Sequence, residues 1–179
     1  MSLPATIWTI GHSTRSAAEF LSVLQVHAIE VIADVRRFPG SRRHPHFGST
    51  ALEDALAGES IDYAWLSKLG GRRRGDSTAE QAGWRNPSFR AYAAYTWTED
   101  FAEGLAELLH IASARRTAVM CSELLWWRCH RALIADVLRF LQVEVVHLAG
   151  EGPGSLHPYT SPARIVDGEL AYPAEDSCC

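Results

Sequence analysis

The chain has 179 residues, of which 47% are hydrophobic and 21% charged, values that are ordinary for one globular domain with a sizeable core. The formal net charge of −4 argues against a surface that binds polyanions along its whole length. No stretch approaches the ~20 apolar residues of a membrane span, and the first residues lack a signal-peptide pattern. We therefore expect a cytoplasmic protein without membrane contact, in which Cys121 and Cys129 are reduced.

The N-terminal half of the chain predicts strands that alternate with helices. Three apolar runs predict strands, at residues 6–10, 30–35 and 61–65. After the first of them, Ser16 caps an amphipathic helix, and Glu19 stands where it completes a capping box. A short helix is predicted over 52–56. Strands separated by helical patterns are typical of βαβ units and a parallel sheet.

The C-terminal half continues this pattern after an irregular stretch at 66–90. The elements expected beyond it are helices over 89–97 and 99–114, a strand over 117–120, a helix that ends at 140 and a strand over 143–148. Asp167-Gly168 lies between apolar runs and predicts a hairpin over 164–172 with a type I′ turn.

These elements together predict the fold class and the domain organisation. We expect a single α/β domain over residues 1–179, with a mainly parallel sheet flanked by helices and a C-terminal β-hairpin. Its core spans about 6–172. Residues 173–179, which include Cys178 and Cys179, are expected to form a disordered tail.

Polar side chains follow the predicted strands at the points where they end. They are His12 and Ser13 after the first strand, Asp34 and Arg36 after the second, Cys121 and Glu123 after the fourth, and His147 in the fifth. Parallel strands place their carboxyl ends at one edge of the sheet, where ligands bind in open α/β folds. We therefore expect residues more than a hundred positions apart to form one site.

The densest cluster of reactive groups is Cys121-Ser122-Glu123 followed by Arg128-Cys129-His130-Arg131. It lies between a predicted strand and a predicted helix, and Cys129 and His130 are expected in the first turn of that helix. Unpaired N–H groups and the helix dipole favour a thiolate there, whereas burial disfavours the thiolate of Cys121. Cys129 is therefore expected to be the more reactive thiol.

Arginine pairs and triplets suggest a local site for an anion. They are Arg36-Arg37, Arg42-Arg43 and Arg72-Arg73-Arg74. Guanidinium groups suit phosphate recognition, and we expect Arg36 and Arg131 to face the same crevice with Ser13 beside them. In the alternative interpretation, Arg36 and Arg131 pair with Asp34 and Glu123 and only neutralise a polar turn.

Several motifs occur in an order that resembles a known family. They are Thr9-Ile10-Gly11-His12-Ser13, Asp34-Val35-Arg36 with Pro39 and Ser41, Leu69-Gly70-Gly71, and Cys121-x-Glu123-x5-Cys129-His130-Arg131. The chain resembles, over about residues 6–172, the family catalogued as domain of unknown function 488. It departs from that family at Trp126, where the last element usually carries Pro. The resemblance implies an α/β fold and a site at these motifs, and it implies no reaction.

The first functional hypothesis is an enzyme that acts on a phosphate-bearing substrate, a nucleotide or nucleic acid. Arg36, Arg131 and the helix N-terminus would hold the anion. Catalysis would use Asp34, Glu123 or His12 as acid or base and Cys121 or Cys129 as nucleophile, with His130 beside them. A hydrolase and a thiol-dependent transferase both fit, and the two thiols also allow a redox step. The sequence identifies no cofactor and no oligomeric state.

Two other classes of function stay open. One is a non-catalytic module that binds nucleotide or nucleic acid through the arginine-rich loops and Trp65, Trp84, Trp97, Trp126 and Trp127, unless these aromatic side chains only pack in the core. The other is a metal-binding protein that uses Cys121, Cys129 and His130 with His12 or His147, although the spacing is not that of a common structural zinc motif.

Overall fold

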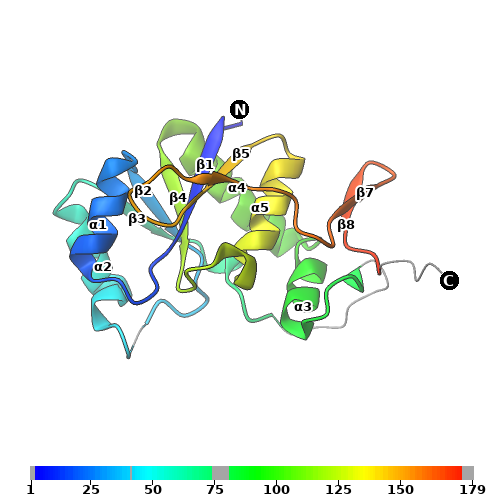
Figure 1. Cartoon of the computed structure of the whole chain (residues 1–179), viewed down its shortest axis with the longest axis horizontal. Coiled ribbons are helices and arrows are strands. Elements are labelled where there is room, and N and C mark those ends of the chain that lie inside the picture. Colours follow the sequence, from blue (N-terminus) through cyan, green and yellow to red (C-terminus); the bar gives the residue numbers. More distant parts are fainter. Residues whose placement is uncertain (1–2, 41, 74–80, 175–179) are drawn as a thin grey trace.

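The computed structural model describes residues 3–40, 42–73 and 81–174. A six-stranded sheet forms its centre, in the order β3-β2-β4-β1-β5-β6 (Figure 1). Its strands are β1 (Thr6–Gly11), β2 (Val31–Asp34), β3 (Asp62–Trp65), β4 (Thr117–Cys121), β5 (Glu144–Leu148) and β6 (Ser155–Leu156). Strands β1 to β5 run parallel, and β6 pairs antiparallel with β5 at the edge. The predicted α/β class with a mainly parallel sheet is confirmed.

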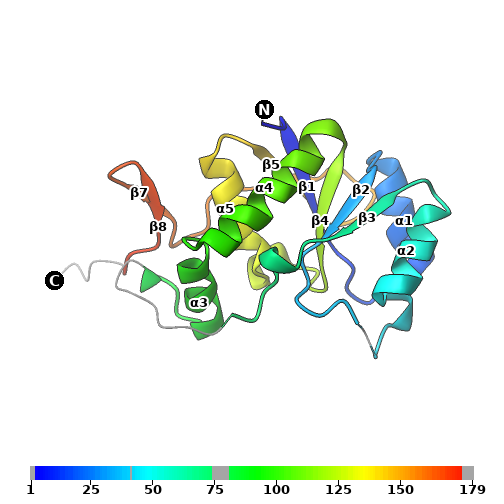
Figure 2. The same cartoon turned by 180° about the vertical axis from the view of Figure 1, so that it is seen from behind.

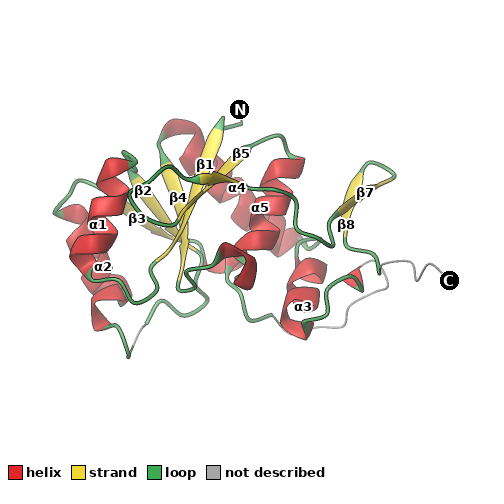
Figure 3. Cartoon of the chain, in the orientation of Figure 1, coloured by secondary structure: helices red, strands yellow, loops and turns green. Residues whose placement is uncertain are grey.

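Helices cover both faces of the sheet (Figures 2 and 3). They are α1 (Ala17–Val26), α2 (Ser49–Ala57), α3 (Pro87–Tyr95), α4 (Glu99–Ala114) and α5 (Arg131–Phe140). Side chains of α1 and α2 pack with Ile10, Ile32 and Met120 in one apolar cluster. Side chains of α3, α4 and α5 pack in a second cluster with strand residues that point the other way. Alternation along the buried strands therefore produces two cores, one on each face.

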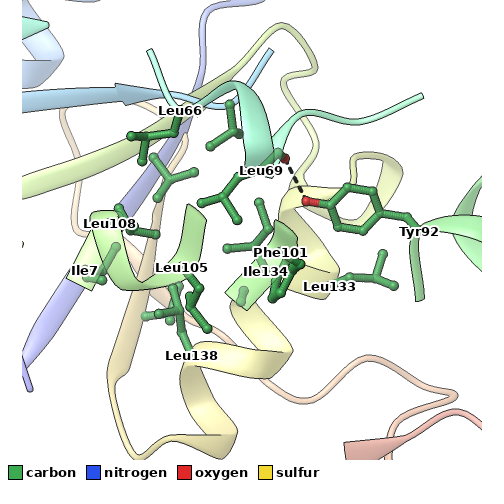
Figure 4. Close-up of a cluster of buried hydrophobic side chains, with 14 of the residues drawn as sticks. Ile7, Leu66, Leu69, Tyr92, Phe101, Leu105, Leu108, Leu133, Ile134 and Leu138 are labelled. Atoms are coloured by element: carbon green, nitrogen blue, oxygen red, sulfur yellow. Dashed lines mark hydrogen bonds between the residues drawn. The ribbon is translucent and has the colours of Figure 1, made fainter. Parts of the chain in front are cut away.

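The larger core lies between the sheet and helices α3, α4 and α5 (Figure 4). It contains Ile7, Leu105, Leu108 and Leu138, all buried. Tyr92 is fully enclosed there, and its hydroxyl donates a hydrogen bond of 2.7 Å to the carbonyl of Leu69. This bond satisfies the phenol in an apolar setting and fixes the segment after β3 against α3.

Most predicted elements are present with small shifts at their ends. The capping box of α1 forms, since the Glu19 amide donates to Ser16 Oγ at 3.2 Å and the Ser16 amide donates to Glu19 Oε2 at 2.7 Å. Helix α3 begins at Pro87, because Asn86 caps it, two residues before the predicted start. The hairpin of β7 (Arg164–Val166) and β8 (Glu169–Ala171) has positive φ at both Asp167 and Gly168, as a type I′ turn requires.

Short elements that the sequence did not predict occur at several places in the chain. Strand β6 was not predicted, because a two-residue edge strand has too few residues to show alternation. Single 3-10 turns occur at Pro45–Phe47 and Trp126–Arg128, where no helical turn was predicted, and at Ser67–Leu69, within the stretch expected to be irregular. Of the tail predicted to be disordered, residues 175–179 lie outside the described residues. Among the helices that the structure describes, none is long and apolar enough to cross a membrane.

A buried chain of hydrogen bonds ties the C-terminal segment to the sheet. His157 Nε2 lies 3.0 Å from Asp136 Oδ1, His147 Nε2 lies 2.9 Å from His157 Nδ1, and Thr9 Oγ1 lies 2.6 Å from His147 Nδ1. The carboxylate only accepts, so each imidazole donates through Nε2 and accepts through Nδ1. Arg131 is the last member of this series of hydrogen bonds, and its Nη1 lies 3.4 Å from Thr9 Oγ1. Both ring nitrogens of the neutral His147 side chain are therefore engaged in hydrogen bonds.

Acidic pH is expected to destabilise the protein through His147. Burial, together with the electrostatic effects of His157 and Arg131, lowers the pKa of this imidazole to about 3. The unfolded chain keeps a pKa of about 6.5, so between these values the unfolded state binds a proton that the folded state excludes. The free energy of unfolding should therefore fall as the pH drops, by about 1 to 2 kcal/mol between pH 7 and pH 5.

Urea denaturation of wild type and of His147→Gln at both pH values measures this contribution. The variant should be less stable at pH 7 but should lose less stability on going to pH 5. His110→Gln, at an exposed position on α4, is the control and should behave as wild type does. Equal losses in wild type and His147→Gln would contradict the prediction.

Candidate functional site

The carboxyl ends of β1, β2 and β4 meet because the three strands are neighbours in parallel register. Gly11 pairs with Cys121 and Asp34 pairs with Met120. The amide of His12 donates to the Cys121 carbonyl at 2.9 Å, and that of Val35 donates to the Met120 carbonyl at 3.0 Å. The residues that follow each strand therefore leave the sheet at one place.

Gly11 allows the chain after β4 to fold tightly over the end of β1. A Cβ at this position would lie 1.8 Å from the Glu123 carbonyl oxygen. Real Cβ atoms do not approach backbone atoms so closely, so only glycine fits. The loop at 122–125 is consequently held against β1, and its exposed side chains border the site.

A cavity of about 820 Å³ opens at this edge of the sheet. Seven residues expected in the site line it, namely His12, Ser13, Arg36, Cys121, Glu123, Cys129 and His130. Asp34 and Arg131 are buried behind its wall, and His147 is buried in the hydrogen-bond network with Thr9 and His157 and does not line the cavity. Further lining residues come from α3, from the segment before α5, from Gly71-Arg72, and from the loop after β2, namely Arg37, Phe38, Gly40 and residues 42–44. Ser41, from the family-like motif, lies outside the described residues.

Asp34 and Arg36 form a buried ion pair in the wall of the cavity. Arg36 Nη2 lies 2.6 Å from Asp34 Oδ2, and Arg36 Nε donates to Oδ1 at 2.9 Å. Arg36 Nη1 donates to the Phe47 carbonyl at 2.7 Å, and the Tyr63 hydroxyl donates to Asp34 Oδ2 at 2.7 Å. Burial of this hydroxyl beside the carboxylate raises the pKa of Tyr63. The positive charge of Arg36 is therefore neutralised, as the alternative interpretation of this residue had it.

His12 lies under the rim of the cavity as a neutral imidazole. Its ring stacks on Phe47 with centroids 4.2 Å apart, and Nδ1 lies 3.0 Å from the Ser13 carbonyl, to which it donates. Burial lowers the pKa of His12 to about 4. Nε2 therefore carries a lone pair, and it lies 3.5 Å from Arg36 Nη1.

Arg131 supports the floor of the cavity from behind. Only 1% of the residue is exposed. Its Nη2 donates to the Glu123 carbonyl and, at 3.4 Å, to the Leu124 carbonyl. Arg131 therefore pairs with the backbone carbonyl of Glu123, and not with its side-chain carboxylate as the alternative interpretation expected. Arg131 holds the loop after β4 in place, and its position gives no support to direct contact with an anion in the cavity.

Cys121, Cys129 and His130 form the floor. Cys121 ends β4, whereas Cys129 and His130 precede α5 instead of lying in its first turn, since His130 is the N-cap residue and the 3-10 turn takes up Trp126–Arg128. Both thiols are free and buried. Cys129 Sγ lies 3.6 Å from His130 Nδ1.

The pKa values of the two thiols shift in opposite directions. Burial acts to raise the pKa of Cys129, but the hydrogen bond from Cys121 and the nearby charge of Arg131 outweigh it and lower that pKa to about 6. The hydrogen bond to Cys129, together with burial, raises the pKa of Cys121 to about 12. The lowered pKa of Cys129 agrees with the expectation that it is the more acidic thiol. Its greater reactivity stays a prediction.

Five arginines line the cavity with exposed side chains, namely Arg37, Arg42, Arg43, Arg72 and Arg128. None has an ion-pair partner within the described part of the chain. Glu123 is the one carboxylate among the described lining residues. The arginine pairs were visible in the sequence, but their exposure was not. Phe89 and Tyr92 of the lining had no signal that separated them from core residues.

The tryptophans expected to stack on bases lie elsewhere. None of Trp65, Trp84, Trp97, Trp126 and Trp127 is among the described residues that line the cavity. Trp84 packs on Phe89, with ring centroids 4.9 Å apart. Trp126 stacks on His147 with centroids 4.3 Å apart and an angle of 6° between the rings. The aromatic part of the binding-module alternative therefore has no support at this site.

Replacement of Arg131 by lysine is expected to lower the free energy of unfolding by about 3 kcal/mol or more. A single ammonium group cannot replace the branched guanidinium, whose nitrogens contact Glu123, Leu124 and Thr9. Urea denaturation measures the change. Arg128→Lys is the matched control, three residues away and exposed, and should shift stability by less than about 0.5 kcal/mol. Similar effects of the two substitutions would contradict the supporting role of Arg131.

Comparison with known proteins finds one family. A family model described as a domain of unknown function, DUF488, matches residues 16–138, which is more than half of the chain. The matched stretch begins at the cap of α1 and runs through β4 and the floor residues into α5. No curated protein and no solved structure matches the chain. The chain belongs to the DUF488 family, a domain of unknown function.

Proposed function

We propose that this protein is an enzyme that acts on a phosphate-bearing substrate, a nucleotide or nucleic-acid segment, with the thiol and imidazole groups of the floor as its reactive centre. The observation that carries the proposal is one cavity whose mouth is lined by exposed arginines and whose floor holds two thiols and an imidazole. Charged groups that can bind a substrate and groups that can react with it thus line one open pocket.

The charge of the cavity favours an anion. Arg42, Arg43, Arg72 and Arg128 present guanidinium groups without carboxylate partners among the described residues, against the single carboxylate of Glu123. Guanidinium groups bind phosphate oxygens in bidentate fashion. The substrate phosphate would therefore lie among these exposed arginines, and the role first assigned to Arg36 and Arg131 passes to them.

The size of the cavity favours a nucleotide. Its volume of about 820 Å³ falls within the range of sites that enclose small ligands, about 300 to 1,000 Å³. Phe38 and Phe89 line it and can contact an apolar base.

The reactive groups divide into thiols and a proton-transfer group. Cys129, as a thiolate, can attack an electrophilic atom or hold a metal ion, and both roles place the chemistry at the floor. Glu123, with an exposed carboxylate, and His12, with a lone pair on Nε2, both line the cavity and can act as acid or base, whereas Asp34 is covered by Arg36. Thiols that work in this way must stay reduced, which favours the cytoplasm as the compartment.

The double variant Arg42→Ala/Arg43→Ala should bind a phosphate-bearing ligand at least about tenfold more weakly than wild type, a change of about 1.4 kcal/mol that one lost charge-assisted hydrogen bond accounts for. Calorimetric titration at low salt would use inorganic phosphate, pyrophosphate, nucleoside mono- and diphosphates, and a short single-stranded oligonucleotide. Arg115→Ala is the control, because Arg115 pairs with Asp62 at the other end of the strands. The proposal fails if no probe binds wild type, or if the control weakens binding equally.

Cys129→Ser should separate an enzyme from a binding module. Because the cavity arginines remain, the variant should keep the ligand affinity of wild type, while product formation, followed by mass spectrometry of the incubated ligand, should be lost. A wild type that binds ligand and never converts it would instead identify a non-catalytic module.

A further inference from the structure

We infer that Cys121, Cys129 and His130 form a zinc site with three protein ligands, whose fourth coordination position faces the arginine-lined cavity. The inference goes beyond the proposed function and does not rest on it, because metal binding is measured without any substrate.

The ligand atoms already lie at distances that suit one metal ion. Cys121 Sγ, Cys129 Sγ and His130 Nδ1 all lie within 4.8 Å of one another, and the last two are 3.6 Å apart. A tetrahedral zinc ion with bonds of about 2.3 Å to sulfur and about 2.0 Å to nitrogen requires sulfur–nitrogen edges of about 3.5 Å and sulfur–sulfur edges of about 3.8 Å. The observed separations need only small rotations of the side chains.

The imidazole of His130 is oriented as a metal ligand. Its Nε2 lies 3.0 Å from the Val35 carbonyl oxygen, which can only accept a hydrogen bond. The proton of the neutral ring is therefore on Nε2, and the lone pair of Nδ1 is directed at the thiols. A backbone carbonyl that fixes the distal nitrogen is the usual outer-shell partner of a metal-bound histidine.

The backbone holds each ligand independently of a metal. The Cys121 carbonyl accepts from the His12 amide, the Cys129 amide donates to the Trp126 carbonyl, and the Cys129 carbonyl accepts from the Ala132 amide. Gly71 closes the other side, since a Cβ there would lie 2.7 Å from His130 Nδ1. The cluster is thus preorganised by three segments distant in sequence.

Two thiolates and an imidazole select the kind of metal. Soft sulfur with nitrogen is typical of zinc, whereas magnesium and calcium need oxygen ligands. Two thiolates also balance the charge of a divalent ion, which a site below several arginines requires. Zinc sites with three protein ligands keep a position for water or substrate, and all three ligands line the cavity from which that molecule would come.

The test is the metal content of the full chain, purified without chelator and measured by plasma mass spectrometry. We expect about one zinc ion per wild-type chain and strong loss of zinc from Cys121→Ser, Cys129→Ser and His130→Ala. The matched control is Cys178→Ser/Cys179→Ser, which changes two cysteines outside the described residues and should keep the zinc. Zinc that persists in the three cluster variants, or that is lost from the control alone, overturns the site.

Cobalt titration keeps the test valid if a cluster variant folds poorly. Chelator-treated wild type should bind one Co²⁺ and develop thiolate-to-cobalt charge-transfer absorption with visible bands of tetrahedral intensity. Azide should perturb those bands, since one position is open. A wild type that holds no zinc and gives no such spectrum rejects the inference. Zinc content without binding of any phosphate probe rejects only the proposed function, and the converse result rejects only the metal site.

Discussion

The buried hydrogen-bond chain from Arg131 to Asp136 is the interaction on which the arrangement of the site depends. At one end Arg131 holds the Glu123 and Leu124 carbonyls, and at the other Asp136 accepts from His157 and from Thr160. A charge buried at each end would be costly without these partners. Thr9, His147 and His157 connect these two ends by hydrogen bonds, so the position of the cavity floor and that of the C-terminal segment depend on each other.

The arginines of this protein divide into two classes by burial. Arg36 and Arg131 lie in the interior, where each satisfies carboxylate or carbonyl oxygens and shapes the wall. Arg42, Arg43 and Arg128 extend into the cavity, where their charge is available to a ligand. The division explains how a chain with a net charge of −4 can carry a strongly basic cavity. The negative charges lie mostly elsewhere on the surface.

The fold was predictable because local and global signals agree. The buried strands are short apolar runs, Ser16 and Glu19 mark a helix start, and Asp167-Gly168 marks a turn. The parallel topology then implied that His12, Cys121 and their neighbours meet. The roles of single side chains were harder to predict, because burial decides them. Arg36 and Arg42 look alike in sequence, yet the three-dimensional packing buries Arg36 in an ion pair with Asp34 and leaves Arg42 exposed.

Trp126 stands where the family-like motif usually has proline, and the structure shows what takes over that position. Proline would restrict the backbone before α5 by its own ring. Here the indole lies flat on His147 and edge-on to His157, so the loop is restrained by aromatic contact with the interior. The conformational entropy of the loop is therefore set by a partner distant in sequence. The C-terminal segment and the floor residues Cys121, Cys129 and His130 should therefore unfold at the same temperature, as one cooperative unit.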